Sequence, residues 1–284
     1  MCLPAPHHCI RRRQRRGCLA GFAAALATGF IALGSALPAS ADTLERIRER
    51  GSVAVCIWPD YYGVSWRNPK TGELSGIGID LARALAADLA LELRFIDSSF
   101  SRLIGDVLSE RCDVAIFAIG ITPERQKYLQ FTQPHLSSGI YAITTRSNRR
   151  IRDWQDIDRP GNVVAVAQGT YHETAMRQQL RHARLLVTQR PKGREEEVQS
   201  GRADVFMTDY PYSRRMLETT AWARLIEPPP QAEKTPYAFA LKPSDAAWHA
   251  RLEAFVASIK ADGRLFRAAR QHRLLPIAVD AHAR

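Results

Sequence analysis

Short apolar runs alternate with amphipathic helical patterns along most of this 284-residue chain. Residues 53–57 and 91–96 have the composition of buried strands, and residues 79–89 between them place leucines on one face of a helix. This order is typical of α/β layers built around parallel sheets. Residues 162–167 open a second series of the same kind, so the pattern predicts two α/β units.

The remaining elements follow the same alternation. Further strands are expected at residues 113–119, 141–144, 204–207 and 237–241, and further helices at residues 100–109, 170–180, 195–200, 212–218, 248–261 and 263–272.

The first 41 residues differ from the rest. Five arginines between residues 11 and 16 precede an apolar, small-residue stretch at 18–37, and Ala39-Ser40-Ala41 follows it. These are the three parts of a secretory signal peptide, with Asp42 as the expected first mature residue. A membrane anchor is the alternative, but polar and glycine residues dilute the stretch, and its apolar length is at the lower limit for spanning a bilayer. The sequence therefore predicts export, by either the general secretory or the twin-arginine route.

The net charge of +11 is partly a property of this N-terminal segment, which holds five arginines and no acid. Farther along, Arg177, Arg181, Arg184, Arg190, Lys192 and Arg194 lie near a run of three glutamates without interleaved aromatic residues. This composition is typical of a solvated helix face and not of a nucleic-acid groove. We therefore expect no nucleic-acid partner, while attraction to an anionic membrane surface stays open.

Cys56 and Cys112 are the only cysteines after residue 41. Both lie in or beside apolar strand-like runs, which favours buried free thiols, although an oxidising compartment also permits a single bridge. The histidines after residue 41 show no ligand spacing with one another or with cysteine. We therefore expect no metal ion and no cofactor.

Polar groups follow the ends of predicted strands, where α/β folds expose ligand sites. In residues 120–125, GITPER, Arg125 lies near the start of a helical turn, and its planar guanidinium suits a carboxylate. A surface ion pair with Glu124 is the alternative.

Two more motifs of this kind lie in the second series. Gly169-Thr170 joins a strand to a helix whose free N–H groups would attract an anion, although a plain turn explains the same residues. Asp209 would hold an ammonium group or cap the helix that begins near Pro211.

Together and in this order, these motifs resemble the solute-binding proteins of polar amino-acid ABC transporters, the family 3 periplasmic receptors. The landmarks are GIGIDLA at residues 76–82, CDVAI at 112–116, the run 120–125 followed by FTQP at 131–134, then Gly169-Thr170 and Asp209. The resemblance covers nearly all of the chain after residue 41.

The resemblance implies a type II periplasmic-binding-protein fold, an α/β fold with two lobes. Each lobe has a mostly parallel sheet flanked by helices, and a two-strand hinge near residues 141–145 and 236–241 joins the lobes. After the signal peptide at residues 1–41, we expect residues 42–142 plus 239–284 in lobe 1 and residues 143–238 in lobe 2.

The resemblance also implies roles for individual residues. Arg125 would bind the ligand α-carboxylate, helped by backbone groups around Thr122 and Thr170, and Asp209 would bind the α-ammonium. Aromatic rings would stack on the ligand side chain, unless they belong to the core. The full expected ligand-binding set is Tyr61, Phe100, Ala118, Gly120, Thr122, Arg125, Gly169, Thr170 and Asp209.

The chain departs from the family pattern at positions that set specificity. Trp58 stands where binders of basic amino acids often carry an acid, which argues against lysine and arginine as ligands, although Asp60 is close by. Gly120 replaces the usual serine or threonine that helps to hold the ammonium, and Phe117 and Ala118 are less polar than the common residues. We therefore expect a weaker or reshaped site.

The function implied is that of a periplasmic, monomeric receptor that captures an amino acid or analogue and delivers it to the permease of an ABC importer, not that of an enzyme. A cyclohexadienyl dehydratase-like enzyme on the same fold is one alternative; it would need a general acid in the cleft, for which Asp209 is the one candidate. A periplasmic accessory protein of a quinoprotein dehydrogenase is another, because that related group also has a cysteine after the first strand, as Cys56 is here. Ligand binding on behalf of a sensor kinase is a third.

Overall fold

The computed structural model describes residues 42–190 and 192–280. Its core elements are two mixed β-sheets. The predicted signal peptide lies outside the described residues. The first sheet has the strand order β5-β1-β6-β14-β7, with β8 also paired to β14. Strand β1 runs parallel to β5 and β6, whereas β14 is antiparallel to its neighbours. The strands are β1 (Ser52–Ile57), β5 (Glu92–Asp97), β6 (Val114–Gly120), β7 (Gln130–Phe131), β8 (Leu136–Ser138) and β14 (Thr235–Leu241).

The second sheet repeats this plan with five strands in the order β11-β10-β12-β9-β13. Strand β10 is parallel to β11 and β12, and β9 is antiparallel to β12 and β13. The prediction of two α/β units is therefore confirmed. The strands are β9 (Tyr141–Thr145), β10 (Val163–Ala167), β11 (Arg184–Thr188), β12 (Val205–Thr208) and β13 (Ala223–Ile226).

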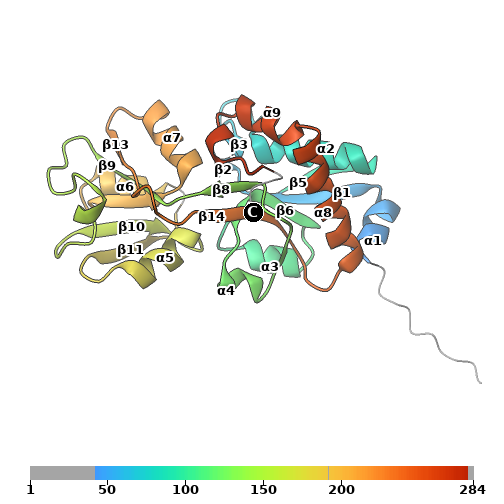
Figure 1. Cartoon of the computed structure of the whole chain (residues 1–284), viewed down its shortest axis with the longest axis horizontal. Coiled ribbons are helices and arrows are strands. Elements are labelled where there is room, and N and C mark those ends of the chain that lie inside the picture. Colours follow the sequence, from blue (N-terminus) through green and yellow to red (C-terminus); the bar gives the residue numbers. More distant parts are fainter. Residues whose placement is uncertain (1–41, 191, 281–284) are drawn as a thin grey trace, which may run out of the picture. The chain divides into compact units, whose positions relative to one another are not determined.

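Helices cover the faces of both sheets (Figure 1). Those that pack with the first sheet or with one another around it are α1 (Thr43–Arg50), α2 (Ile77–Leu89), α3 (Leu103–Leu108), α8 (Ala246–Ala261) and α9 (Arg264–Gln271). Those that pack on the second sheet are α5 (Tyr171–Gln179), α6 (Gly193–Gln199) and α7 (Tyr210–Thr219). The short elements are α4 (Pro123–Gln126), the 3₁₀ helices η1 (Trp154–Asp156) and η2 (Leu275–Ile277), and a small sheet of β2 (Asp60–Tyr61), β3 (Ser65–Arg67) and β4 (Leu74–Ser75).

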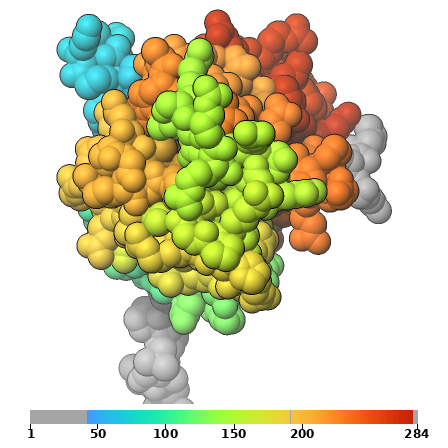
Figure 2. Space-filling model, turned by 90° about the vertical axis from the view of Figure 1, so that its left-hand side faces the viewer, coloured from blue at the N-terminus to red at the C-terminus, as the bar shows by residue number. Residues whose placement is uncertain are grey.

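The chain passes between the sheets twice, from β8 to β9 and from β13 to β14. The two passages lie beside each other, because Ser138 of β8 pairs with Thr235 of β14. In Figure 1, β8 and β14 run through the middle of the molecule. The connection from β9 to β10 contains η1 and forms the yellow-green segment at the front of Figure 2. The lobe boundaries and the hinge expected from the resemblance stay predictions.

The central strands are buried on both faces, which explains their continuous apolar sequences. Every residue of β1 and of β6 is buried. The edge strand β5 instead alternates between exposed and half-buried positions along most of its length. The core has a larger cluster around the first sheet and a smaller one around the second. No helix among the described residues is long and apolar enough to cross a membrane.

Cys56 of β1 and Cys112, two residues before β6, form a disulfide with Cα atoms 5.5 Å apart. The favoured interpretation of these cysteines as free thiols is therefore wrong, and the alternative of a single bridge is correct. Strands β1 and β6 are neighbours in the sheet, so pairing brings together two residues that are 56 positions apart in sequence. Sequence spacing does not carry this information.

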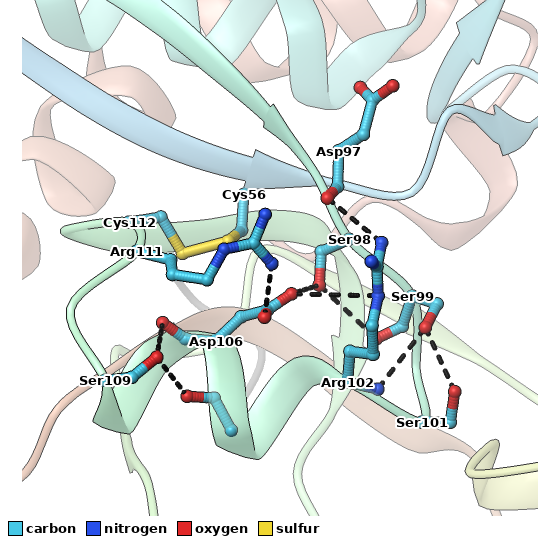
Figure 3. A network of polar contacts seen from close by, with 11 residues as sticks. Cys56, Asp97, Ser98, Ser99, Ser101, Arg102, Asp106, Ser109, Arg111 and Cys112 are labelled. Atoms are coloured by element: carbon cyan, nitrogen blue, oxygen red, sulfur yellow. Dashed lines mark hydrogen bonds and ion pairs between the residues drawn. A yellow bond between two sulfur atoms is a disulfide. The ribbon is translucent and has the colours of Figure 1, made fainter.

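A buried carboxylate near the disulfide holds the loop that follows β5. Asp106 of α3 accepts a hydrogen bond from Ser98 Oγ at 2.7 Å and another from Arg111 Nη1 at 2.5 Å (Figure 3). Arg102 donates to the carbonyl of Asp97 at 3.1 Å. Together with the disulfide, these bonds fix the start of the segment that leads to Phe100.

We expect the double substitution Cys56→Ala/Cys112→Ala to lower the free energy of unfolding by about 4 kcal/mol, because the bridge closes a long loop and restricts the unfolded chain. Urea denaturation of the oxidised wild type and of the variant measures this difference. Wild type unfolded with a reductant is the control that separates loss of the bridge from loss of side-chain packing. A difference below about 1 kcal/mol would contradict the prediction.

Candidate functional site

The carboxyl ends of parallel strands from both sheets meet at one pocket. Residues at or just after the ends of β1, β5, β6, β10 and β12 line a small cavity of about 20 Å³. This volume holds about one water molecule, so a larger ligand requires the walls to move apart. The position is where α/β folds bind ligands. Seven residues of the set expected from sequence line this inner pocket: Tyr61, Phe100, Ala118, Gly120, Arg125, Thr170 and Asp209.

Arg125 bridges the strand ends of the two sheets. Thr122 caps α4 by accepting a hydrogen bond from the Arg125 amide at 3.2 Å, and Pro123 begins the helix. The guanidinium donates Nη1–H to the carbonyl of Gly120 at 2.9 Å and Nη2–H to that of Gly169 at 3.0 Å. Three of its five N–H donors remain for other partners.

Burial shapes the charge of Arg125. The side chain is 7% exposed, and desolvation lowers its pKa to about 10, so it remains a cation at neutral pH. The ring of Phe100 lies 5.4 Å from the guanidinium carbon. The alternative of a surface pair with Glu124 is wrong, because Glu124 pairs with Lys127 at 3.1 Å.

Thr122 and Gly169 lie behind the pocket wall and position Arg125. Gly169 has a φ of 75°, and a Cβ there would come within 2.7 Å of the Ser101 backbone. Its amide donates to Glu173 Oε2 at 2.8 Å, so this N–H at the start of α5 is already satisfied. Thr170, the N-cap of α5, lines the pocket and donates its hydroxyl to the carbonyl of Ala167.

Asp209 caps a helix and faces the pocket at the same time. Its Oδ1 accepts from the amide of Tyr212 at 3.2 Å, which caps α7. Its Oδ2 accepts from the hydroxyl of Tyr237 at 3.0 Å and from the hydroxyl of Tyr61. Burial raises the pKa of Asp209, and these three hydrogen bonds oppose that effect. A carboxylate has about four acceptor positions, so Asp209 has roughly one left for a ligand.

The structure explains two departures from the family pattern. A Cβ at Gly120 would lie 2.9 Å from Cγ2 of Thr235, so a serine or threonine at 120 requires Thr235 to shift. Ala118 has a φ of 52°, in the left-handed region, where the pairing of β6 with β14 changes register. Such backbone strain concentrates at ligand sites, and here it lies on the pocket wall.

Three aromatic rings of the first-sheet side contact one another in the pocket. Trp58 lies 5.1 Å from Tyr61 and 5.3 Å from Phe100, measured between ring centroids. Trp58 also stacks on Tyr212 with an angle of 7° between the rings at 6.4 Å. A ligand that enters the inner pocket therefore has to meet, or separate, these rings.

Several pocket residues were not expected from sequence. Arg194 of α6 belongs to the basic run that was interpreted as a solvated helix face, and for this residue that interpretation is wrong. Its side chain is buried because the first turn of α6, Gly193 to Glu195, packs against the second sheet. The others not in the expected set are Trp58, Tyr171, His172, Thr208, Tyr212 and Tyr237.

His172 is a buried imidazole on the pocket wall. It is 8% exposed, and neither ring nitrogen has a hydrogen-bond partner among the described residues. Burial, and then the charges of Arg194 and Arg125, lower its pKa to about 3, so it is neutral at physiological pH. Thr208 Oγ1 is likewise buried without a partner in this part of the chain. Within residues 42–190 and 192–280, no cluster of three or more His, Cys, Asp or Glu is arranged to hold a metal ion.

The chain matches a family model, "Bacterial extracellular solute-binding proteins, family 3", over residues 53–273. A cyclohexadienyl dehydratase of Pseudomonas aeruginosa is 33% identical over 186 residues, which cover 65% of this chain and 69% of that protein. An ABC transporter arginine-binding protein of Escherichia coli is 26% identical over 196 residues, covering 67% and 78%. An ancestral amino acid-binding protein, described as a precursor of cyclohexadienyl dehydratase, superposes with a TM-score of 0.74 and 26% identity, over 81% of this chain and 98% of that one. The expected two-lobed type II fold is thereby confirmed.

We expect stability to fall with decreasing pH because of two buried histidines. Burial lowers the pKa of both His172 and His135 from 6.5 to about 3. The unfolded chain therefore binds more protons between these values, and the stabilisation is complete above pH 6.5 and is lost as the pH falls. From pH 7.5 to pH 5.0, each histidine lowers the free energy of unfolding by about 2 kcal/mol.

Urea unfolding at both pH values tests this with His172→Gln, which should reduce the difference between the two by about 2 kcal/mol. His182→Gln is the matched control, because His182 is exposed. An unchanged pH dependence in His172→Gln would show that His172 is not the titrating group.

Proposed function

The chain belongs to family 3 of the bacterial extracellular solute-binding proteins, and on this premise we propose that it captures an amino acid or a close analogue in the inner pocket and delivers it to an ABC importer. The observation that carries the proposal is the buried guanidinium of Arg125. It donates hydrogen bonds to two backbone carbonyls, and its remaining N–H donors can bind a carboxylate in a desolvated site. Such charge-assisted bonds are strong and directional.

The opposite charge in the pocket supports a zwitterionic head group. Asp209 is buried beside Tyr61 and Tyr237 and faces the same space as Arg125. An ammonium group would take its remaining acceptor position and would need further acceptors from Thr170 or from backbone carbonyls. The names of two relatives agree with an amino-acid ligand, since one is an arginine-binding and one an amino acid-binding protein.

Capture by closure requires two lobes that move about the passages β8–β9 and β13–β14. Contacts between the strand ends of the two sheets support this proposal, because Arg125, which follows β6 of the first sheet, donates a hydrogen bond to the carbonyl of Gly169, which follows β10 of the second. Residues 1–41 would act as the signal peptide that exports the chain to the periplasm, where it would act as a monomer with an ABC permease. Closure around a bound ligand is a recognised motion of two-lobed binding proteins.

A dehydratase is the second candidate, favoured by the 33% identity to a cyclohexadienyl dehydratase. Elimination of water and carbon dioxide requires a general acid that donates a proton to the leaving hydroxyl. Burial raises the pKa of Asp209, as such an acid needs. However, Asp209 accepts hydrogen bonds from one amide and two hydroxyls, which favours its carboxylate form. We therefore place binding ahead of catalysis.

A thermal-shift screen against amino acids, small dicarboxylates and prephenate tests ligand capture with protein purified after expression of the full chain. A ligand at a hundred times its dissociation constant should stabilise the protein by about 2.7 kcal/mol, which raises the melting temperature by a few degrees. Arg125→Ala should abolish this shift, whereas Lys127→Ala, an exposed cation two residues on, should retain it. If no compound stabilises the wild type, capture is refuted and the accessory-protein alternative gains support.

The dehydratase candidate has a separate test. We expect the wild type to leave prephenate and arogenate unconsumed over hours, because three hydrogen-bond donors to Asp209 favour its carboxylate form over the protonated acid. Ultraviolet absorbance follows the loss of the cyclohexadienyl ring. Catalytic consumption that disappears in Asp209→Asn would establish an enzyme with Asp209 as its acid.

A further inference from the structure

A second buried arginine, Arg194, lines the pocket, and neither the family motif nor the head-group geometry uses it. It is 4% exposed and lies in the first turn of α6. Its Nη1–H donates to the carbonyl of Met207 at 3.1 Å, and its guanidinium carbon lies 4.1 Å from the centre of the Tyr212 ring. Burying a guanidinium costs free energy unless partners compensate its charge, so the position needs an explanation.

The protein compensates this charge with aromatic rings and with an ion pair of limited geometry. The guanidinium carbon also lies 5.1 Å from the centre of the Phe206 ring, and although burial lowers the pKa of Arg194, interactions led by those with Tyr212 and Glu195 raise it by more. Nε of Arg194 lies 3.6 Å from Oε2 of Glu195, beyond hydrogen-bond distance. The other oxygen of Glu195 accepts from the hydroxyl of Tyr212. Oε2 itself has no hydrogen-bond partner among the described residues. The pair is therefore an ion pair without the two parallel bonds that an arginine and a carboxylate form at their best.

Two guanidiniums and one carboxylate line the inner pocket, and the buried Glu195 beside Arg194 supplies a second carboxylate behind its wall. The formally charged side chains that line it are Arg125, Arg194 and Asp209. Most acceptor positions of Asp209 are filled by Tyr61, Tyr237 and the amide of Tyr212. A ligand with one carboxylate and one ammonium would satisfy Arg125 and Asp209 and would leave Arg194 with its ion pair to Glu195 and with unused N–H donors.

Two unpartnered polar groups lie on the same wall. His172 is more than nine-tenths buried, and both of its ring nitrogens lack a partner in the described part of the chain. Arg194 and Arg125 both act on this imidazole, which places it near the two cations. Buried polar groups normally have hydrogen-bond partners, so His172 and the hydroxyl of Thr208 indicate that a polar ligand group is bound here.

Arg194 also lines a second, larger cleft that adjoins the inner pocket and shares Trp58, Phe100, Thr170 and Tyr212 with it. Arg102, Arg190 and Lys192 line this outer cleft, against the carboxylates of Asp60 and Asp97. Those two carboxylates are paired with Arg215 at 3.2 Å and Arg67 at 2.5 Å, respectively, whose side chains lie outside the cleft lining. Arg190 in turn pairs with Glu196 at 3.1 Å, and Arg102 lies 4.0 Å from Asp106, so the positive charge that this cleft offers an anion comes mainly from Lys192 and Arg194.

We infer that the ligand carries two carboxylates, one bound by Arg125 and the other by Arg194 with hydrogen bonds from His172 and Thr208. This rests on the proposed function and narrows it to dicarboxylic amino acids or plain dicarboxylic acids. Both ligand classes carry the two carboxylates that Arg125 and Arg194 would bind. A basic amino acid would instead bring a third positive charge against Arg125 and Arg194.

Calorimetric titration of protein purified after expression of the full chain tests the inference with pairs of ligands that differ in one group. L-Glutamate against L-glutamine, and glutarate against its monoamide, isolate the second carboxylate. Glutarate against L-glutamate distinguishes a plain dicarboxylic acid from a dicarboxylic amino acid. Succinate, L-aspartate and prephenate test the length and shape of the ligand. L-Arginine tests whether a cationic ligand binds. We expect each preferred dicarboxylate to bind at least about tenfold more tightly than its amide.

The matched variant is Arg194→Gln/Glu195→Gln, which removes the cation together with its buried counter-ion and keeps the net charge. It should weaken dicarboxylate binding by about tenfold or more and change monocarboxylate binding by less than about threefold. Arg202→Gln/Glu197→Gln is the control, because that exposed pair, 2.6 Å apart, lies at the other end of α6. If circular dichroism shows that the double variant does not fold, Arg194→Lys replaces it. This variant keeps the charge but loses the planar guanidinium, and it should still weaken the binding of dicarboxylates selectively.

The outcomes separate this inference from the proposed function. If glutamine-like or basic ligands bind as tightly as dicarboxylates, and Arg125→Ala abolishes that binding, the inference is overturned and the proposed function stands. Dicarboxylate preference that survives in the Arg194 variants also overturns it. If no compound binds the wild type, both fall.

Discussion

The hydrogen bonds from Arg125 to the carbonyls of Gly120 and Gly169 are the contact on which the arrangement of the site depends. Each carbonyl lies at or just after the end of a buried strand, one in each sheet. Because α/β connections place polar groups at these ends, two sheets that face each other in this way produce a pocket walled by backbone dipoles and a few side chains. The cation between them donates a hydrogen bond to each carbonyl. The same group therefore holds the two walls together and offers its remaining donors to a ligand.

Much of the fold was predictable because periodicity reports on burial. Fully buried β1 and β6 appear as continuous apolar runs, and Arg125 and Asp209 stand directly after strands, where a ligand site is expected. The small sheet β2–β4 was not predictable, since strands of two or three residues have no period. Arg194 was misassigned because it stands in a run of charged residues that has the composition of an exposed helix face, and only packing of α6 on the second sheet buries it. The Cys56–Cys112 bridge and the Tyr237–Asp209 bond likewise depend on which strands become neighbours.

The disulfide, Asp106 and Phe100 connect the scaffold to the pocket. The bridge fixes β1 to the turn before β6, and Asp106 holds Ser98 and Arg111 on either side of α3. The segment after Ser98 then presents Phe100 to Arg125 and packs the Ser101 backbone on Gly169, where a side chain would not fit. A change of geometry in this segment therefore reaches both walls of the pocket.

The electrostatics of the pocket fit the proposed recognition of a ligand with carboxylate groups. Burial raises the pKa of Asp209, while three hydrogen bonds to its oxygens oppose that effect and leave roughly one acceptor position for an ammonium group. Two guanidiniums line the same pocket as His172, which burial and then their charges keep neutral, with one donor and one acceptor to offer. In the proposed complex, a neutral imidazole would donate a hydrogen bond to a bound carboxylate without adding a third charge. Under the proposed dicarboxylate recognition, specificity would come from the hydrogen bonds that a second carboxylate makes with Arg194, His172 and Thr208, which a ligand with a single carboxylate cannot make.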